Sequence, residues 1–295
     1  MRKNNNNKKS RLVSILLIII AVIIAVNIFE NLSVGVTDYE VDLNSENSEP
    51  LRIVQLSDIH MIRSNRQDGY LYRKVLNLFP DVIAITGDLI DADKYSNEEF
   101  QRMTVQFCKH LCSIAPVYYV YGNHEIMLLD DPQNNSFKLE LEAVGVNILN
   151  NKTTVIEKNG VEYNLLGLQD PATLYRDPVY SNKGYRVADI LKDMLYESDN
   201  DNIHILLSHR PELFKVYTED YDIDLTLTGH AHGGQFRIPF TDISAYAPNQ
   251  GFLPKYTSGI YINNGNSMIV SRGIGNSVIP VRIFNMPEIV VIDIK

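Results

Sequence analysis

The 295-residue chain has little cysteine and no regular repeat, and these shortages exclude several classes of protein. Its only two cysteines, Cys108 and Cys112, stand four residues apart on one face of a predicted helix, a spacing typical of neither a zinc site nor a thioredoxin-type pair. They are predicted to be packing residues, because a free cysteine usually behaves as a small buried hydrophobe. The apolar content of 45% is enough for a substantial core.

The chain also lacks an excess of positive charge. Its net charge is −9, and because residues 1–30 hold five basic residues and one acid, the remainder carries −13. Binding along a nucleic-acid backbone depends on Lys and Arg contacts to phosphates, so no long nucleic acid is expected as a partner. An envelope nuclease acting on a mononucleotide or cyclic nucleotide stays open, and the salt dependence of any such binding would test it.

One long apolar run lies near the N-terminus. Residues 1–11 form a basic tail, and residues 12–29 are interrupted only by Ser14 and Asn27. At about 1.5 Å per residue this run is just long enough to span a bilayer as a helix. A cleaved signal peptide is disfavoured because a small-x-small cleavage site is missing, and a buried soluble helix is the third alternative. The run is predicted to be an uncleaved transmembrane signal anchor of a single-pass cell-membrane protein, with the tail cytoplasmic and the rest extracytoplasmic.

Beyond the anchor, apolar runs of strand length alternate with helical patterns. A first strand and a polar linker are expected in residues 30–50, and one globular domain in residues 51–295. This order predicts an α/β fold, a sandwich of two packed mixed β-sheets flanked by helices. Strands are predicted at 34–43, 51–56, 82–86, 117–121, 146–149, 203–207, 224–227, 259–262, 268–271 and 289–294, and a hairpin at 153–168 around Asn159-Gly160. Helices are predicted at 70–79, 97–112, 136–144, 187–195 and 211–217. Ser96 and Glu99 would form the capping box of the helix at 97–112.

Five polar clusters directly follow predicted strands and contain five of the seven histidines. Each cluster alone could be an ordinary turn or helix entry. Because ligands of open α/β sheets bind at the carboxyl ends of the strands, all five together predict a single site. The clusters are Asp58-Ile59-His60, Gly87-Asp88-Leu89-Ile90-Asp91, Gly122-Asn123-His124-Glu125, Ser208-His209-Arg210-Pro211 and Thr228-Gly229-His230-Ala231-His232-Gly233-Gly234.

Leaving Glu125 aside, the clusters offer three carboxylates, one amide and five imidazoles, but no thiolate. Such a mixed oxygen and nitrogen set suits manganese, iron or zinc rather than calcium or a structural zinc. Two cations about 3.5–4 Å apart need a bridging carboxylate and a bridging water or hydroxide between them. A centre of this kind lowers the pKa of the bound water and stabilises charge on phosphoryl oxygens, which favours phosphoester hydrolysis.

These motifs, D-x-H, G-D-x-x-D, G-N-H-[DE], H and G-H-x-H, resemble the signature of the calcineurin-like metallophosphoesterases, over roughly residues 51–294. The N-terminal span and the stretches 207–212 and 229–235 are similar to those of the membrane-anchored bacterial branch of that family. The resemblance implies a cofactor of two divalent metal ions, with manganese the first choice. It implies one metal held by Asp58, His60 and His232, a second held by Asn123, His209 and His230, and Asp88 as the bridge between them.

The resemblance also implies two catalytic residues. His124 would stabilise the transition state and protonate the leaving group, and Asp91 would orient His124. Asp91 is equally well interpreted as a helix-entry residue. Arg63 and Arg210 lie beside the motifs and are candidate phosphate contacts.

The substrate implied is a phosphodiester, a phosphomonoester or a pyrophosphate. Protein phosphatases of the family have an arginine where this chain has Ala92, which disfavours a phosphoprotein. Some membrane-associated relatives cleave lipid-linked UDP-sugars, so a lipid-linked or cell-envelope substrate is a hypothesis. The alternative is a catalytically silent, membrane-tethered module that binds phosphate ligands, and a His124→Ala variant would distinguish the two. The sequence does not predict the oligomeric state.

Overall fold

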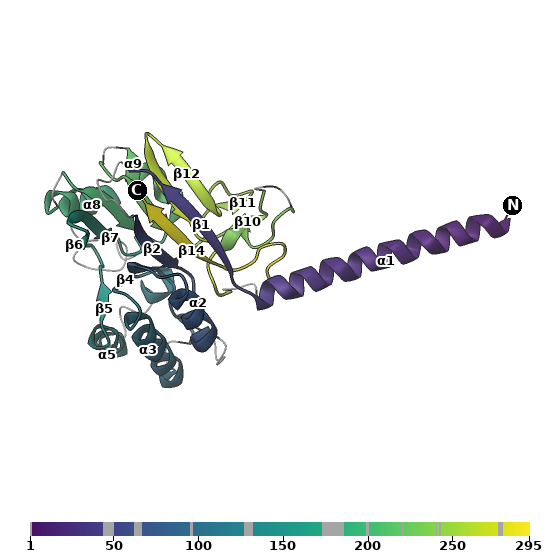
Figure 1. The fold of residues 1–295 in the computed structure, drawn as a ribbon, viewed down its shortest axis with the longest axis horizontal. Helices are drawn as coiled ribbons and strands as arrows, with labels where there is room; N and C mark the ends of the chain where they lie inside the picture. The colour runs from purple at the N-terminus through teal and green to yellow at the C-terminus, as the bar shows by residue number, and fades with distance from the viewer. Residues whose placement is uncertain are drawn as a thin grey trace.

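The computed structural model describes residues 2–43, 50–61, 67–94, 97–126, 132–172, 186–198, 201–219, 221–239, 241, 243–276 and 280–295. Within these residues, two six-stranded β-sheets lie face to face and helices cover the outer face of each sheet. A long N-terminal helix leaves this body on one side (Figure 1). The predicted α/β sandwich of two mixed sheets flanked by helices is therefore confirmed.

The first sheet contains the strands that precede three of the predicted clusters. Its order is β1-β14-β2-β3-β4-β5. Strands β2 to β5 are parallel, β14 is antiparallel to β2, and β1 runs parallel to β14 at the edge. The strands are β1 (Gly35–Val41), β2 (Leu51–Leu56), β3 (Val82–Thr86), β4 (Val117–Val120), β5 (Val146–Ile148) and β14 (Glu288–Ile294).

The second sheet contains the strands that precede the other two clusters. Its order is β12-β13-β9-β8-β7-β6, with four central parallel strands and an antiparallel strand at each edge. A separate two-stranded ladder joins β10 (Tyr246–Ala247) to β11 (Gly251–Phe252). The strands of the sheet are β6 (Lys152–Lys158), β7 (Val161–Gly167), β8 (Ile203–Leu207), β9 (Leu225–Thr228), β12 (Gly259–Asn263) and β13 (Asn266–Val270).

Helices pack on the outer face of each sheet. The first sheet is covered by α2 (Tyr72–Leu76), which continues the π-helical turn η1 (Gln67–Leu71), by α3 (Glu98–Cys112) and by α5 (Pro132–Ala143). The second is covered by α8 (Val187–Tyr196) and α9 (Phe214–Thr218). Three short elements follow strand ends: α4 (Asn123–Ile126) and the 3₁₀ turns η2 (Pro211–Leu213) and η3 (His232–Gly234).

The central strands are apolar along their whole length because both of their faces are buried. In β3, Ile83 and Ile85 pack beneath the helices, whereas Val82 and Ala84 face the second sheet. Parallel strands covered on both sides read as continuous apolar runs rather than as alternating ones. This is why the sequence pattern located β3 at the residues predicted for it.

The turn predicted from local sequence is confirmed, whereas the predicted start of one helix is shifted by one residue. The predicted Asn159-Gly160 turn joins β6 to β7, and both residues have positive φ angles, 52° and 83°, as a two-residue hairpin turn requires. Helix α3 instead begins after Asn97, whose Oδ1 accepts the Glu99 N–H at 2.9 Å. The cap was predicted one residue too early, since Ser and Asn cap equally well. Ser96 itself lies outside the described residues.

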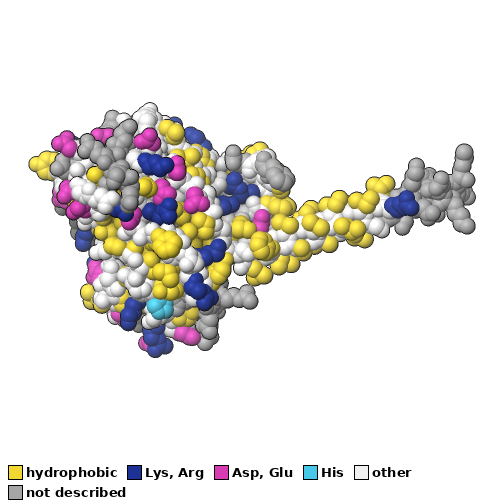
Figure 2. Space-filling view, viewed as in Figure 1, with side chains coloured by type: hydrophobic (Ala, Val, Ile, Leu, Met, Phe, Trp, Pro, Cys, Tyr) yellow, Lys and Arg dark blue, Asp and Glu magenta, His cyan; other side chains and the backbone are white. Residues whose placement is uncertain are grey.

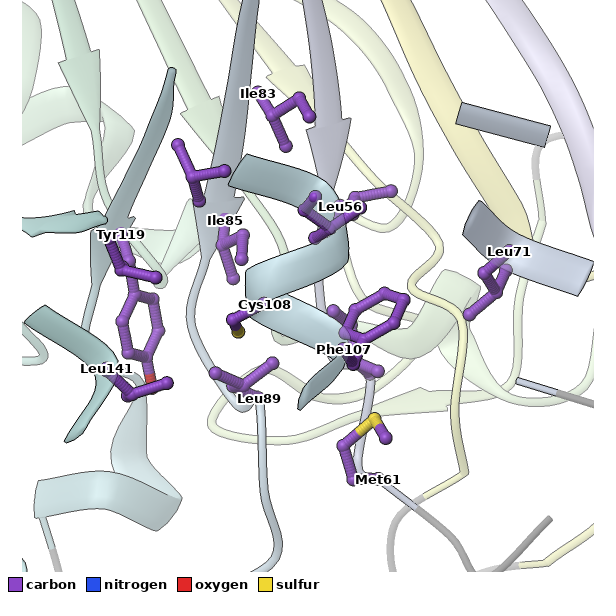
Figure 3. Close-up of a cluster of buried hydrophobic side chains, with 14 of the residues drawn as sticks. Leu56, Met61, Leu71, Ile83, Ile85, Leu89, Phe107, Cys108, Tyr119 and Leu141 are labelled. Carbon is purple, nitrogen blue, oxygen red and sulfur yellow. The ribbon is translucent and has the colours of Figure 1, made fainter. Parts of the chain in front are cut away.

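The two cysteines are packing residues, as predicted. Both are free, and Cys108 is fully buried in the core between α3 and the first sheet (Figure 3). Burial raises the pKa of the Cys108 thiol, which keeps it protonated and unreactive.

Truncating Phe107 should destabilise the domain strongly. Its ring is fully buried in the same core, as Figure 3 shows. A Phe107→Ala variant is expected to lower the free energy of unfolding by about 3–5 kcal/mol, because it removes apolar contacts and leaves a cavity. Phe79→Ala, at a side chain that is 77% exposed, should change it by no more than about 0.5 kcal/mol. Chemical denaturation of the full-length protein in detergent measures both, and equal effects would contradict the assignment of Phe107 to the core.

Helix α1 (Arg2–Leu32) projects away from the domain. Its residues Arg11–Leu32 are long and apolar enough to cross a membrane, with a mean hydropathy of 3.2, and none of that stretch is buried within the protein. Figure 2 shows hydrophobic side chains around the helix where it extends from the domain. The predicted span, residues 12–29, lies within this stretch, which is exposed rather than packed in the core of the domain.

Candidate metal centre

The predicted site residues come together at the carboxyl ends of both sheets. Strands β2, β3 and β4 of the first sheet, and β8 and β9 of the second, each end in one of the predicted clusters. Gln55 joins the two sheets just before this point, since its Nε2 donates to Thr86 Oγ1 at 2.9 Å and to Thr228 O at 2.8 Å. The convergence predicted from strand-end topology therefore occurs.

The first group of converging side chains contains Asp58, His60 and His232. His232 Nε2 lies 3.3 Å from Asp58 Oδ1 and 3.3 Å from His60 Nε2. All three side chains are buried, and their candidate ligand atoms lie within 4.8 Å of one another. Two imidazole nitrogens that face each other beside a carboxylate are arranged as they would be around a cation.

The second group contains Asp88, His209 and His230. His209 Nε2 lies 3.2 Å from Asp88 Oδ2 and 3.1 Å from His230 Nδ1. The groups meet at Asp88, whose Oδ2 is also 3.8 Å from Nε2 of His60 in the first group. One carboxylate therefore lies between two sets of possible ligands.

Three of the histidines are oriented by hydrogen bonds on the ring nitrogen that faces away from the centre. His60 Nδ1 bonds to Asp91, His209 Nδ1–H donates to Thr86 O at 2.7 Å, and His230 Nε2–H donates to Asn249 Oδ1 at 2.9 Å. Because a neutral imidazole has one N–H and one lone pair, each of these bonds directs a lone pair toward the centre.

Asn123 and His124 complete the arrangement from the end of β4. Asn123 Oδ1 is buried and, among the residues that the structure describes, has no hydrogen-bond partner. A buried acceptor without a partner is costly unless a cation or a water satisfies it. His124 Nε2 points toward Asp88 Oδ2 at 4.0 Å, and its side chain is 19% exposed, so a bound molecule can reach it.

The backbone at these positions is unusual. Five of the predicted ligands have positive φ angles: Asp58 (49°), His60 (45°), Asp88 (52°), His230 (63°) and His232 (47°). Each such non-glycine conformation costs about 1–3 kcal/mol and persists only where the surroundings fix it. Here the carboxylate of Asp58 accepts the His230 N–H at 3.0 Å, and His60 N–H donates to Asp88 O at 3.0 Å. Hydrogen bonds between the clusters therefore hold strained loops in place.

The buried charges shift one another's protonation. Burial alone would lower the pKa of His209, but Asp88 and Asp58 outweigh it and raise that pKa to about 10. Burial lowers the pKa of His232 to about 3, so this ring is neutral, as a metal ligand must be. Burial would raise the pKa of Asp88, but His209 and His60 lower it well below its usual value. The carboxylates of the centre thus stabilise positive charge on His209, and a cation bound there would take the place of that proton.

Glu125 is the last residue of its cluster, and no role was predicted for it. Its carboxylate is 3% exposed and accepts backbone N–H groups from both neighbouring loops. The donors are Asp88 (3.1 Å), Leu89 (2.8 Å), Ile90 (3.3 Å) and Gly122 (2.8 Å). Glu125 therefore fixes the loop that carries Asp88 against the loop that carries Asn123 and His124.

Substituting Gly122 should disturb Asp88 directly. A Cβ at Gly122 would lie 2.3 Å from Asp88 Oδ1 and 2.6 Å from Asp88 N, so the carboxylate must move. Gly122→Ala is expected to weaken divalent-cation binding by about 10–100-fold, the range for groups that orient ligands. Gly69→Ala, whose Cβ would have its nearest neighbour at 4.0 Å, serves as the control. Equilibrium dialysis with Mn²⁺ measures both, and unchanged affinity in Gly122→Ala would show that Asp88 is not a ligand.

One predicted contact differs in the structure. Asp91 was expected to orient His124, but it bonds to His60 and Lys94, and its Oδ1 is 3.7 Å from His124 Nδ1. His124 Nδ1 instead accepts the Ala92 N–H at 3.1 Å. Burial would raise the pKa of Asp91, but His60 and Lys94 lower it to about 2.

Of the two candidate phosphate contacts, Arg210 is engaged elsewhere. Its guanidinium donates to Asp170 at 2.6 and 3.2 Å and to Glu212 at 3.3 Å, so it forms a structural ion pair. The other candidate, Arg63, lies outside the described residues.

Two residues from distant parts of the chain also touch the centre. Asn249, in the turn between β10 and β11, contacts His230 as described above. Arg282 is fully buried; its Nη2 lies 3.4 Å from His232 Nδ1 and donates to Gly275 O at 2.5 Å. Neither residue stands in a motif, so neither was predicted to lie at the centre.

Comparisons with known proteins show the family of the chain. The profile of the calcineurin-like phosphoesterase family matches residues 51–234. The uncharacterized metallophosphoesterase YkuE of Bacillus subtilis is 28% identical over 260 residues, covering 83% of this chain and 79% of that protein. A second B. subtilis metallophosphoesterase, YkoQ, is 25% identical over 244 residues, covering 81% and 82%. A dimetal phosphatase from Danio rerio has a TM-score of 0.45 and 13% identity, over 76% of this chain and 88% of that one. On its family profile and its relatives, the chain belongs to the calcineurin-like phosphoesterases and is a metallophosphoesterase.

Proposed function

We propose that the protein binds two divalent cations side by side and hydrolyses a phosphodiester, a phosphomonoester or a pyrophosphate. The observation that carries this proposal is the place of the Asp88 carboxylate, 3.8 Å from His60 Nε2 in one group and 3.2 Å from His209 Nε2 in the other. The first cation would be held by Asp58, His60 and His232, the second by Asn123, His209 and His230, and both by Asp88.

The side chains fit cations in three respects. The outer ring nitrogens of three histidines are already satisfied, which leaves their lone pairs directed inward. Asn123 Oδ1 is a buried acceptor without a partner among the described residues. The donor set is oxygen and nitrogen without thiolate, which suits manganese, iron or zinc.

Two cations bound here would lower the pKa of a coordinated water and neutralise charge on the phosphoryl oxygens. The protein's own contribution to proton transfer comes from His124. Because His124 Nδ1 accepts the Ala92 N–H, the proton of the neutral ring is on Nε2, which faces the centre. The neutral ring is therefore placed to hydrogen-bond a phosphoryl oxygen or a leaving oxygen through Nε2–H. To protonate the leaving oxygen, the ring would first take a second proton on Nδ1 and release the Ala92 N–H; the imidazolium would then give up its Nε2 proton and return to the neutral form. Asp91 supports the centre by orienting His60.

We further propose that the chain is a single-pass membrane protein, with residues 1–11 as a cytoplasmic tail, residues 12–29 as the anchor and residues 51–295 as an extracytoplasmic catalytic domain. The basic tail and the exposed apolar helix support this arrangement. A catalytic domain tethered in this way favours a lipid-linked or cell-envelope phosphoester, such as a UDP-sugar lipid, over a soluble macromolecule.

Metal removal tests the proposed activity. Full-length protein in detergent, stripped with a chelator, should lose hydrolysis of an aryl phosphodiester and regain it when Mn²⁺ is restored. A panel of aryl monoesters, diesters and lipid pyrophosphates would then give the preferred bond. Stoichiometric metal binding without turnover of any of these compounds would sink the enzyme proposal and favour the silent phosphate-binding module instead.

A further inference from the structure

The end of helix α1 is attached to the catalytic domain by specific hydrogen bonds. The amide of Asn31 pairs with the backbone of Arg282, donating to its carbonyl at 2.7 Å and accepting its N–H at 2.9 Å. One turn earlier, Asn27 Oδ1 accepts the Phe284 N–H at 2.9 Å. The loop at 281–284 is therefore fixed along the last turns of the helix.

This attachment lies within the apolar stretch of the helix. That stretch runs from Arg11 to Leu32, and Asn27 is five residues before its end. At about 1.5 Å per residue, the contact with Phe284 lies about 3 Å inside the end of the proposed anchor at residue 29 and about 7–8 Å inside the end of the apolar stretch at Leu32. Interfacial protein elements reach about 5–10 Å into the boundary between headgroups and acyl chains, so the loop would lie at that depth.

The loop continues into an exposed apolar surface, which we call the interfacial surface. Backbone hydrogen bonds from Ile283 to Gln235 (3.2 Å) and from Arg237 to Ile283 (3.0 Å) join it to the segment that leads to β10 and β11. Figure 1 places β10 and β11 on the side of the domain from which α1 leaves. The surface consists of six exposed side chains: Ile238 (53%), Ile243 (50%), Phe252 (84%), Leu253 (75%), Val281 (50%) and Ile283 (39%).

The inner side of the same segments touches the candidate metal centre. Asn249, between β10 and β11, accepts the His230 Nε2–H, and Arg282, between Val281 and Ile283, lies against His232. One layer of residues therefore separates the interfacial surface from two of the predicted ligands.

We propose that the interfacial surface docks onto the bilayer that α1 spans and holds the metal centre against the lipid headgroups. This inference rests on the proposed anchor and deepens the proposed function, because it makes a phosphoester carried at the membrane surface the substrate class. Two observations favour the bilayer as the partner of this surface. The surface is continuous with the loop that is bonded to α1. Its most exposed apolar pair, Phe252 and Leu253, is also followed closely by the cationic Lys255. Apolar side chains flanked by a cation are typical of interfacial segments.

The absence of tryptophan from the chain allows a direct test. Single Phe252→Trp and Leu253→Trp variants of the full-length protein are reconstituted in phosphatidylcholine vesicles with and without brominated acyl chains. Bromine quenches a nearby indole, so both variants should lose emission in brominated vesicles. Leu17→Trp, in the middle of the span, is the positive control. Tyr196→Trp, 91% exposed at the end of α8 on the far side of the domain, is the negative control.

Quenching of the Phe252→Trp and Leu253→Trp variants, with none in Tyr196→Trp, supports the docking surface. If Leu17→Trp is quenched but neither variant of the pair is, the surface contacts water, a second copy or another protein, and the docking proposal is wrong although the anchor stands. If Leu17→Trp is not quenched, the anchor fails and the docking proposal fails with it. Equal quenching at Tyr196→Trp also overturns the proposal. None of these outcomes depends on activity, so phosphoester hydrolysis is judged separately by the metal-removal test.

Discussion

An Asp88→Asn variant is expected to lose about 10³-fold in kcat/KM for an aryl phosphodiester and to bind fewer than two divalent cations per chain. The expected loss follows from charge: a metal centre contributes several kcal/mol to stabilising the transition state, and each 1.36 kcal/mol corresponds to a tenfold change in rate. Asp88 is the one predicted ligand close to both groups, so removing its negative charge should affect both cations.

The asparagine substitution separates charge from shape. The side-chain oxygen can still accept the His124 N–H, which Asp88 Oδ1 accepts at 3.0 Å, so the loop should keep its conformation. Asp38→Asn, at an exposed position of β1, removes the same charge far from the centre and should leave both activity and metal content unchanged. Metal analysis and kinetics on the same preparations make the measurement. A folded Asp88→Asn protein with full metal content and wild-type turnover would rule out a bridging carboxylate at this position.

A His124→Gln variant should behave differently from Asp88→Asn, because His124 is proposed to transfer a proton and not to hold a metal. It is expected to keep two cations per chain and to lose about 10²–10⁴-fold in kcat/KM, the usual contribution of general acid catalysis. The glutamine side chain can still accept the Ala92 N–H, so the local backbone keeps its partner.

The leaving group gives a second readout for His124. An ester with a good leaving group needs little protonation, so nitrophenyl esters should suffer less from His124→Gln than alkyl esters of the same phosphate. His110→Gln, on the exposed face of α3, provides a control histidine remote from the centre. Equal losses for both classes of ester would argue against proton donation, and a loss of metal would make His124 a ligand.

Much of the fold could be predicted because a strand buried on both faces appears in the sequence as a nearly continuous apolar run. Strands such as β3 and β8 appear as short apolar runs, and the sites at their ends appear as the polar residues that interrupt the pattern. The convergence of Asp58 and His232, 174 positions apart, followed from topology alone. These residues lie where parallel strands of two facing sheets end, so the sequence order of the strands was sufficient.

The contacts that were not predicted depend on tertiary packing. Arg282 reaches His232 across 50 positions of sequence from a segment with no motif, and Asn249 comes from a turn between two short strands. Asp91 was assigned to His124 by resemblance, but its distance from two histidines is set by how the loops after β2 and β3 pack.

A crystal structure of the full-length protein with Mn²⁺, with data collected at the manganese absorption edge, tests the central claim most directly. Two anomalous peaks about 3.5–4 Å apart are expected, one beside Asp58, His60 and His232 and the other beside Asn123, His209 and His230, with Asp88 between them. A single peak, or peaks away from these side chains, would contradict the two-metal centre.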